Sequence, residues 1–139
     1  ITGMTGHQQN PTTGPTLQQE PTVAIRIEDV CRAAGIQRVR VVDPQDMRAV
    51  EAALKEELAV DEPSVIIARR PCMLLKYVKP NPPLAVDPAK CVGCKACMRI
   101  GCPAISFRNG KAGIDETLCV GCGLCEQMCR VGAFQKKEA

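Results

Sequence analysis

Aromatic side chains and strong net charge are nearly absent from these 139 residues. The chain has two phenylalanines, one tyrosine and no tryptophan, and its net charge is only +3. Proteins that bind nucleic acids normally carry a clustered basic surface or aromatic side chains on which bases stack. We therefore expect no nucleic-acid partner.

Long apolar runs are also missing. The longest are a few residues, whereas a membrane-spanning helix needs about 20. The first residues do not resemble a secretory signal. We expect a soluble, cytoplasmic protein of a reducing, anaerobic cell, without a membrane partner.

Cysteine, in contrast, is abundant, and eight of the ten cysteines form two runs. The first run is Cys91, Cys94, Cys97 and Cys102, and the second is Cys119, Cys122, Cys125 and Cys129. Three cysteines at two-residue gaps let one loop bind three corners of a [4Fe–4S] cubane, and in two-cluster ferredoxins the fourth cysteine binds the other cluster. We therefore assign Cys91, Cys94, Cys97 and Cys129 to one cluster, and Cys119, Cys122, Cys125 and Cys102 to the other.

Zinc and disulfides are the alternatives for these cysteines. Zinc sites typically use separated C-x2-4-C pairs rather than three cysteines at successive two-residue gaps. Disulfides require an oxidising compartment. We therefore favour two [4Fe–4S] clusters, which transfer single electrons, over both alternatives. The remaining cysteines, Cys31 and Cys72, are expected to be small packing residues.

An internal repeat supports the cluster interpretation. The sequence Cys91-Val-Gly-Cys94 recurs 28 residues later as Cys119-Val-Gly-Cys122. Gly93, Gly121 and Gly123 are expected to allow sharp turns around the clusters. Short apolar patches after each run, at 104–107 and 131–134, are expected to shield the clusters from water. Two departures from the usual bacterial run are a four-residue gap at 98–101, predicted to bulge the loop, and Arg130 in place of proline.

The composition changes at the proline-rich segment 79–83. We predict an α/β domain over residues 1–78, a stiff linker over 79–85 and a cluster-stapled α+β domain over 86–139. Such a small unit has too few large apolar side chains to form a core without staples.

Residues 22–70 show alternating helix and strand patterns. Ile27, Val30 and Ala34 share a helical face that ends before Gly35, and residues 38–42 form a strand pattern. Asp43 is interpreted as the N-cap of a second helix, with Pro44 at its first helical position. An apolar stripe follows in that helix, formed by Met47, Val50, Leu54 and Leu58. Pro63-Ser64 opens a strand over 65–68, so the pattern predicts part of a parallel sheet.

Three segments together resemble one family, the thiamine-diphosphate-dependent 2-oxoacid:ferredoxin oxidoreductases. Met4 to Gln8, continuing through Asn10-Pro11 and Gly14, resembles the cofactor loop of these enzymes. The segment 63–72 and the cysteine-rich tail resemble the alpha subunit of indolepyruvate:ferredoxin oxidoreductase. The resemblance implies the end of a thiamine-diphosphate-binding α/β domain followed by a bacterial-type 2[4Fe–4S] ferredoxin domain. We expect the chain to be a C-terminal piece of a longer polypeptide. A deliberately trimmed chain or an incomplete gene sequence would look the same.

The resemblance also implies an activity and partners. The family oxidatively decarboxylates a 2-oxoacid, here an arylpyruvate, with coenzyme A as acyl acceptor, an external ferredoxin as electron acceptor and a beta subunit as partner. Thr5, Gly6, His7 and Gln8 match the thiamine diphosphate loop. A non-catalytic electron-transfer module, with residues 1–78 as a docking domain, is the alternative function, and a zinc-stabilised interaction module is a third.

One consequence concerns the cofactor. The family's Gly-Asp motif and asparagine, which hold Mg²⁺ and the diphosphate, have no counterpart in these 139 residues. We therefore expect the chain alone to bind thiamine diphosphate weakly or not at all. Isothermal titration calorimetry that shows tight, Mg²⁺-dependent binding would contradict this expectation.

Basic side chains receive no firm role from the sequence. Arg69 and Arg70 could bind an anion but are by default solvated at a strand end. Four others, Lys111, Arg130, Lys136 and Lys137, could steer an acidic ferredoxin, although a solubilising surface is the default.

Overall fold

The computed structural model describes residues 9–73, 75 and 77–136. The chain divides into two compact units, residues 1–78 and 79–139. None of the described helices combines the length and the apolar character that a membrane crossing requires.

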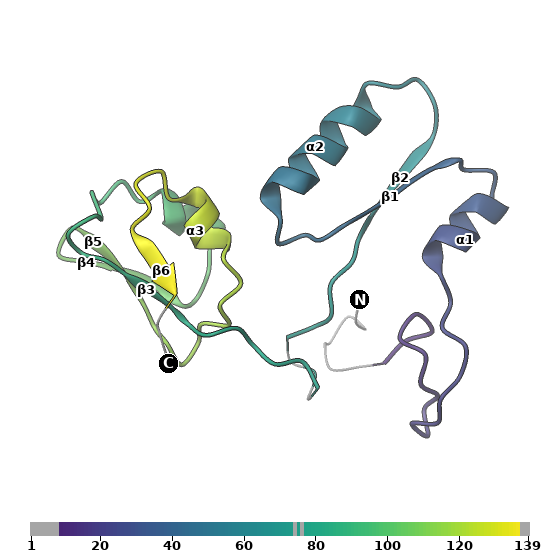
Figure 1. The fold of residues 1–139 in the computed structure, drawn as a ribbon, viewed down its shortest axis with the longest axis horizontal. Coiled ribbons are helices and arrows are strands. Elements are labelled where there is room, and N and C mark those ends of the chain that lie inside the picture. The colour runs from purple at the N-terminus through teal and green to yellow at the C-terminus, as the bar shows by residue number, and fades with distance from the viewer. Residues whose placement is uncertain (1–8, 74, 76, 137–139) are drawn as a thin grey trace. The chain divides into compact units, whose positions relative to one another are not determined.

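The first unit is built around a parallel pair of strands. Its elements in order are α1 (Ile27–Ala33), β1 (Arg38–Val42), α2 (Met47–Leu58) and β2 (Ser64–Ala68). Strand β1 pairs with β2 in parallel from Arg38 opposite Ser64 to Val42 opposite Ala68. Helix α2 connects the two strands and packs against them (Figure 1). The predicted strand–helix–strand order is therefore confirmed within the described residues.

Helix α1 ends as the sequence indicates. Its C-cap is Ala34, and Gly35 follows with φ of +86°, a conformation that glycine adopts without steric cost. On the same helix Glu28 is buried, and both of its carboxylate oxygens accept hydrogen bonds from Arg69 at 2.7 Å. Arg69 therefore stays exposed, as expected at a strand end, and at the same time ties β2 to α1.

The start of α2 differs from the prediction. The N-cap is Asp46, whose side chain accepts a hydrogen bond from the Ala49 amide at 3.0 Å, and Asp43 lies outside the helix. Asp43 instead accepts a hydrogen bond from the Gln45 amide and forms an ion pair with Arg70. The N-cap prediction at Asp43 was wrong because two aspartates three residues apart can each cap a helix, and Asp43 is used in the turn.

The apolar stripe of α2 is largely exposed in the described structure. Leu54 is 45% and Leu58 83% exposed, whereas the helix buries Ala53 and Glu57. Glu57 accepts hydrogen bonds from Arg38 and Arg40 on β1, so an ion-pair network joins the helix to the sheet.

The Glu28–Arg69 pair predicts a pH-dependent stability. The hydrogen bonds from Arg69 lower the pKa of Glu28 from 4.5 to about 2. A carboxyl whose pKa is depressed by folding stabilises the fold above its ordinary pKa, and this contribution is lost as the pH falls from about 4.5 towards 2. Between pH 5 and 3, the thermal unfolding midpoint, followed by circular dichroism, should therefore fall more steeply in the parent than in Glu28→Gln. Asp29→Asn, an exposed change on the same helix, should keep the parent's slope, and equal slopes in parent and Glu28→Gln would contradict the prediction.

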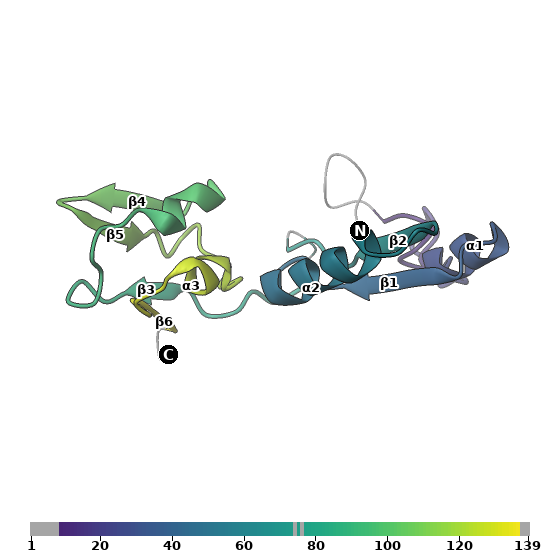
Figure 2. The ribbon, with the colours of Figure 1, turned by 90° about the horizontal axis from the view of Figure 1, so that it is seen from above.

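The second unit contains two antiparallel strand pairs and two short helices. Its elements are β3 (Leu84–Val86), the 3-10 helix η1 (Ala96–Ile100), β4 (Ile105–Arg108), β5 (Lys111–Ile114), α3 (Leu124–Met128) and β6 (Phe134–Lys136). Strand β3 pairs with β6, and β4 pairs with β5. The two pairs lie one above the other in Figure 2, and β3 contacts β5. The core is small and consists of Leu84, Cys97, Ile105, Cys125 and Phe134.

The 28-residue repeat extends beyond the cysteines. Asp87 and Asp115 each accept a hydrogen bond from the amide two residues later, at 2.9 Å. Their backbone amides donate to the carbonyl oxygens of Ala133 and Ala104, at 2.7 and 2.8 Å, and their carbonyl oxygens accept from Cys91 and Cys119. Each cysteine loop is therefore entered through the same aspartate turn, docked on the other half of the unit.

The segment expected to be a linker is partly structured. Strand β3 begins at Leu84, inside the predicted range 79–85. The Asn81 side chain donates a hydrogen bond to the Gly121 carbonyl oxygen at 3.2 Å. Asn81 and its neighbours thus pack on the second unit rather than forming a free spacer.

Candidate metal centre

Four of the predicted ligands surround one cavity in the second unit. Cys91, Cys94 and Cys97 of the first run line it together with Cys129 of the second run. The rest of its wall is mainly apolar and includes Phe107, Val131, Ala133 and Phe134. These are members of the two patches predicted to shield the clusters. The fold thus brings together four thiols that the sequence separates by up to 38 positions.

The thiols of this cavity affect one another's ionisation. Burial raises the pKa of Cys97, and the neighbouring charges of Cys91, Cys94 and Cys129 raise it further. A cationic metal core would remove this repulsion, because metal coordination deprotonates thiols and neutralises their mutual charge.

Backbone amides point at two of these sulfurs. Hydrogen bonds from the Ala112 and Gly93 amides lower the pKa of Cys91, with a further contribution from the charge of Lys111. The Ala133 amide donates to the Cys129 Sγ at 3.3 Å. Such donors stabilise thiolates and tune the potential of a bound cluster.

Three cysteines of the second run, Cys119, Cys122 and Cys125, lie close enough to affect one another's ionisation. Burial raises the pKa of Cys125 to about 11, and the charges of Cys122 and Cys119 raise it as well. Cys102, the predicted fourth member, packs against the apolar core that contains Cys97 and Cys125. Its assignment to the second set stays a prediction.

The residues fit iron–sulfur clusters by two criteria. The four thiols line the walls of a single apolar cavity, as the corners of a polynuclear core require, and amide donors face their sulfurs. Within residues 9–73, 75 and 77–136, no three Cys, His, Asp or Glu side chains converge as ligands of a single metal ion. Cluster ligation by these cysteines is therefore compatible with the observed geometry.

Glycine is required in both loops by close contact as well as by conformation. Gly93 and Gly121 have φ of +70° and +63°. A Cβ on Gly93 would lie 2.4 Å from the Gly110 carbonyl oxygen, and one on Gly121 would lie 2.5 Å from that of Pro82. The two contacts are equivalent under the 28-residue repeat. Gly123 has φ of +78°, as a sharp turn requires.

The four-residue gap of the first run is accommodated in a short helix. Residues Ala96–Ile100 form the 3-10 helix η1, which ends at Gly101 with φ of +69°. The second run instead continues from α3 directly into Cys129. The first run, with one more residue, therefore forms a 3-10 helix that ends in a left-handed glycine, where the second run forms an α-helix that ends at the cysteine.

The predicted thiamine diphosphate loop, Thr5, Gly6, His7 and Gln8, lies outside the described residues. The residues that follow it form a turn, in which the Asn10 side chain accepts hydrogen bonds from the Thr12 amide and hydroxyl. The Gln9 Oε1 and Asn10 Nδ2 atoms are buried and have no hydrogen-bond partner within the described structure. One acceptor and one donor thus remain available beside the predicted loop.

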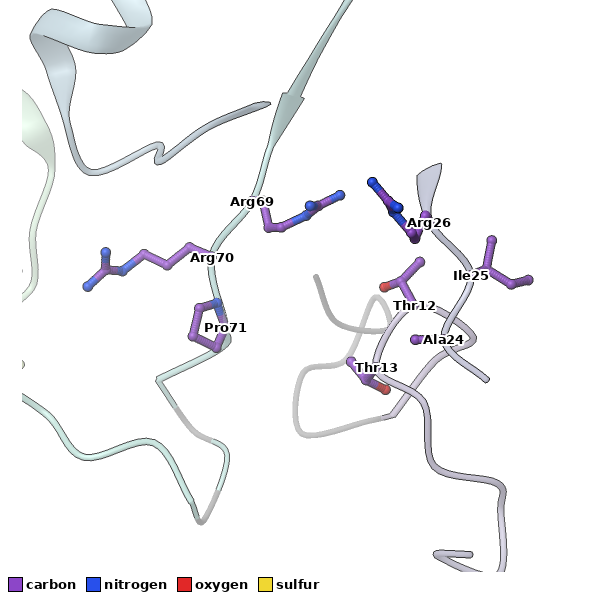
Figure 3. A pocket seen from close by; sticks show the side chains of 8 residues that line it. All are labelled: Thr12, Thr13, Ala24, Ile25, Arg26, Arg69, Arg70 and Pro71. Carbon is purple, nitrogen blue, oxygen red and sulfur yellow. The ribbon is translucent and has the colours of Figure 1, made fainter. Parts of the chain in front are cut away.

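A second cavity lies in the first unit. Arg69 and Arg70 lie on one side of it, and Arg26, Thr12 and Thr13 lie on the other (Figure 3). Each arginine has a carboxylate partner, namely Asp29, Glu28 and Asp43. The positive charge is therefore largely balanced, and the threonine hydroxyls donate to Asn10. The earlier idea of an anion site at Arg69 and Arg70 gains no support from this arrangement.

Some features of the site were not found from the sequence. The aspartate turns were not predicted from the sequence. Neither were the contact of the Gly93 loop with Gly110 and the contact of the Gly121 loop with the segment 81–82. A signal was present, because Asp87 and Asp115, and Asn81 and Asn109, are each 28 residues apart.

Comparisons with known proteins agree with the two units. Residues 1–68 match the thiamine pyrophosphate enzyme family, C-terminal TPP binding domain, and residues 112–135 match the 4Fe-4S binding domain family. The chain thus combines a thiamine-binding domain with an iron–sulfur domain. Their cofactors are thiamine diphosphate, in the full-length subunit, and 4Fe–4S clusters.

Similar proteins carry both parts in the same order. The chain is 42% identical to "Indolepyruvate oxidoreductase subunit IorA" of Pyrococcus horikoshii, with 98% of this chain and 22% of that protein covered. It is 41% identical to the subunit of the same name from Thermococcus kodakarensis, with 97% and 22% covered, and 36% identical to that of Methanothermobacter marburgensis, with 96% and 22% covered. The chain therefore belongs to the IorA subunit family, corresponds to its C-terminal part, and spans about a fifth of the length of these relatives.

Proposed function

We propose that this chain is the electron-relaying C-terminal part of the alpha subunit of a thiamine-diphosphate-dependent indolepyruvate, or arylpyruvate, oxidoreductase. The overall reaction is oxidative decarboxylation of the 2-oxoacid to an acyl-coenzyme A. A beta subunit completes the enzyme, and an external ferredoxin accepts the electrons. Cysteine thiolates stay free to bind clusters only in a reducing compartment, and this favours the cytoplasm as the location.

The observation that carries this proposal is the cavity that joins Cys91, Cys94 and Cys97 to Cys129. Those four residues would hold one [4Fe–4S] cluster, and Cys119, Cys122, Cys125 and Cys102 would hold the other. The clusters supply one-electron storage and transfer. The chain's own part is to fix the thiolates, donate amide hydrogen bonds to their sulfurs and exclude water with Phe107, Ala133 and Phe134.

In the first unit the chain would contribute one side of the thiamine diphosphate site, with Mg²⁺ held elsewhere in the full subunit. Thr5, Gly6, His7 and Gln8 would contact this cofactor. The buried Gln9 and Asn10 amide groups next to this loop support a polar ligand there. Thiamine diphosphate supplies the carbon–carbon bond cleavage chemistry when it is bound.

The proposal is tested by metal analysis and by activity. Anaerobically reconstituted chain should contain about eight irons and eight sulfides, as expected for two cubanes, with little zinc, and should give an EPR signal after dithionite reduction. The full enzyme should reduce ferredoxin with indolepyruvate only in the presence of coenzyme A and thiamine diphosphate. Zinc without iron would overturn the electron-relay role, and two clusters without thiamine-dependent activity would favour the alternative of a non-catalytic electron-transfer module.

A further inference from the structure

Charge is divided unevenly between the two cysteine runs. Residues 88–114, which contain the first run, include five lysines and arginines and no aspartate or glutamate. Residues 115–129, which contain the second run, include three aspartates and glutamates and no lysine or arginine. The stretch around the first run is therefore uniformly basic, whereas the basic residues of the second half, Arg130, Lys136 and Lys137, follow Cys129.

Two of the lysines lie directly against the first cavity. Lys95 lines it, and its Nζ is 4.8 Å from the centroid of the Phe107 ring. The Lys111 Nζ donates a hydrogen bond to the Cys91 carbonyl oxygen. Both side chains belong to exposed residues, so their positive charge is available at the surface beside the cavity.

Two further basic residues extend this surface. Arg108 is the cross-strand partner of Lys111 in the β4–β5 pair, and Lys90 immediately precedes Cys91. Both are exposed, and the ion pair of Lys90 with Asp87 is long, at 3.8 Å. We refer to Lys90, Lys95, Arg108 and Lys111 as the basic rim.

The same edge brings a predicted cluster ligand to the surface. Cys94 is exposed, whereas its repeat counterpart Cys122 is only partly so. Val92, next to Cys94, is 66% exposed. Electron transfer between proteins requires a redox centre close to the docked surface, and the Cys94 corner of the first centre meets this requirement.

We infer that the basic rim is the docking surface for an acidic one-electron carrier protein, and that electrons leave through the centre formed by Cys91, Cys94, Cys97 and Cys129. Positive charge steers an acidic partner to the rim. This inference rests on the proposed function, to which it adds the exit centre and the docking face.

The test compares two double variants of the full two-subunit enzyme. Lys90→Gln with Arg108→Gln removes two charges from the rim without changing a residue that lines the cavity. The matched control, Arg130→Gln with Lys136→Gln, removes two exposed charges outside residues 88–114. Binding of an acidic ferredoxin whose iron is replaced by redox-inert gallium is measured at low and high ionic strength, together with iron content and the indolepyruvate-driven reduction of ferredoxin and of methyl viologen.

The rim variant should bind the gallium ferredoxin about tenfold more weakly at low ionic strength, with a smaller difference at high ionic strength. Its iron content and viologen reduction should equal those of the parent, and the control should bind as the parent does. Unchanged binding by the rim variant, or an equal or larger loss in the control, would overturn the docking face. Absence of substrate-driven viologen reduction in the parent would instead refute the proposed function, while the gallium binding data would still report on the rim.

Discussion

Replacing Cys129 with alanine should remove the cluster of the first run, although Cys129 belongs to the second. The four thiols of Cys91, Cys94, Cys97 and Cys129 line one cavity. A cubane left with three thiolates is labile, whereas the second centre keeps all four of its predicted ligands. We expect iron to fall from about eight to about four atoms per chain, and the EPR signal of the reduced protein to lose the features of two interacting clusters.

The controls for this experiment are available in the chain itself. Cys72→Ala and Cys31→Ala change cysteines outside both runs and should leave the iron content at the parent's level. Cys102→Ala should also leave about four irons, but with the spectrum of the other cluster. The residual spectrum of Cys129→Ala should match that of Cys97→Ala, whose thiol lines the same cavity. A match with Cys125→Ala instead would contradict the crossed assignment.

Substituting alanine for Gly121 should strongly destabilise the second unit. The left-handed conformation, with φ of +63°, costs an alanine about 1–2 kcal/mol. The new Cβ would also lie 2.5 Å from the Pro82 carbonyl oxygen, and overpacking of this kind costs about 1–3 kcal/mol. The combined loss of about 2–5 kcal/mol should appear as faster loss of cluster absorbance in anaerobic guanidinium chloride.

Gly110 provides the matched control for this substitution. Its φ of +75° is also left-handed, but a Cβ there meets no atom within 4 Å. Gly110→Ala should therefore carry only the conformational cost, and Gly93→Ala should behave like Gly121→Ala because its Cβ would meet the Gly110 carbonyl oxygen. Equal effects of Gly110→Ala and Gly121→Ala would show that close backbone contact is unimportant.

The elements of the first unit were predictable where local pattern decides them. Strands β1 and β2 are short β-branched runs, and Gly35 marks the end of α1, because both signals depend on neighbouring residues alone. The ion pairs of the two buried glutamates were not predictable. Glu28 and Arg69 are 41 residues apart, and Glu57 and Arg38 are 19 apart, so only the tertiary fold brings them together.

Local signals were also insufficient where two residues compete for one role. Asp43 and Asp46 can both cap α2; Asp46 does so, while Asp43 forms an ion pair with Arg70. The apolar stripe of α2 indicated the helix correctly but did not indicate which face the described unit buries.

For the cluster site, spacing predicted which cysteines act together and the fold added the contacts around them. The cavity shared by both runs is consistent with the crossed assignment made from the sequence. The close contacts of Gly93 and Gly121 with backbone carbonyl oxygens could not be predicted, because a glycine in a loop does not indicate which carbonyl oxygen approaches it.

The cavity shared by both runs also has a consequence for biosynthesis. Cys129 follows Cys97 by 32 residues, so the residue that closes the cavity leaves the ribosome only after the first loop has done so. We expect iron and sulfide to be inserted only after both loops have left the ribosome. Until then the three thiols of the first loop are open to oxygen and to competing metals, and maturation factors that shield nascent thiols would increase the yield of active protein.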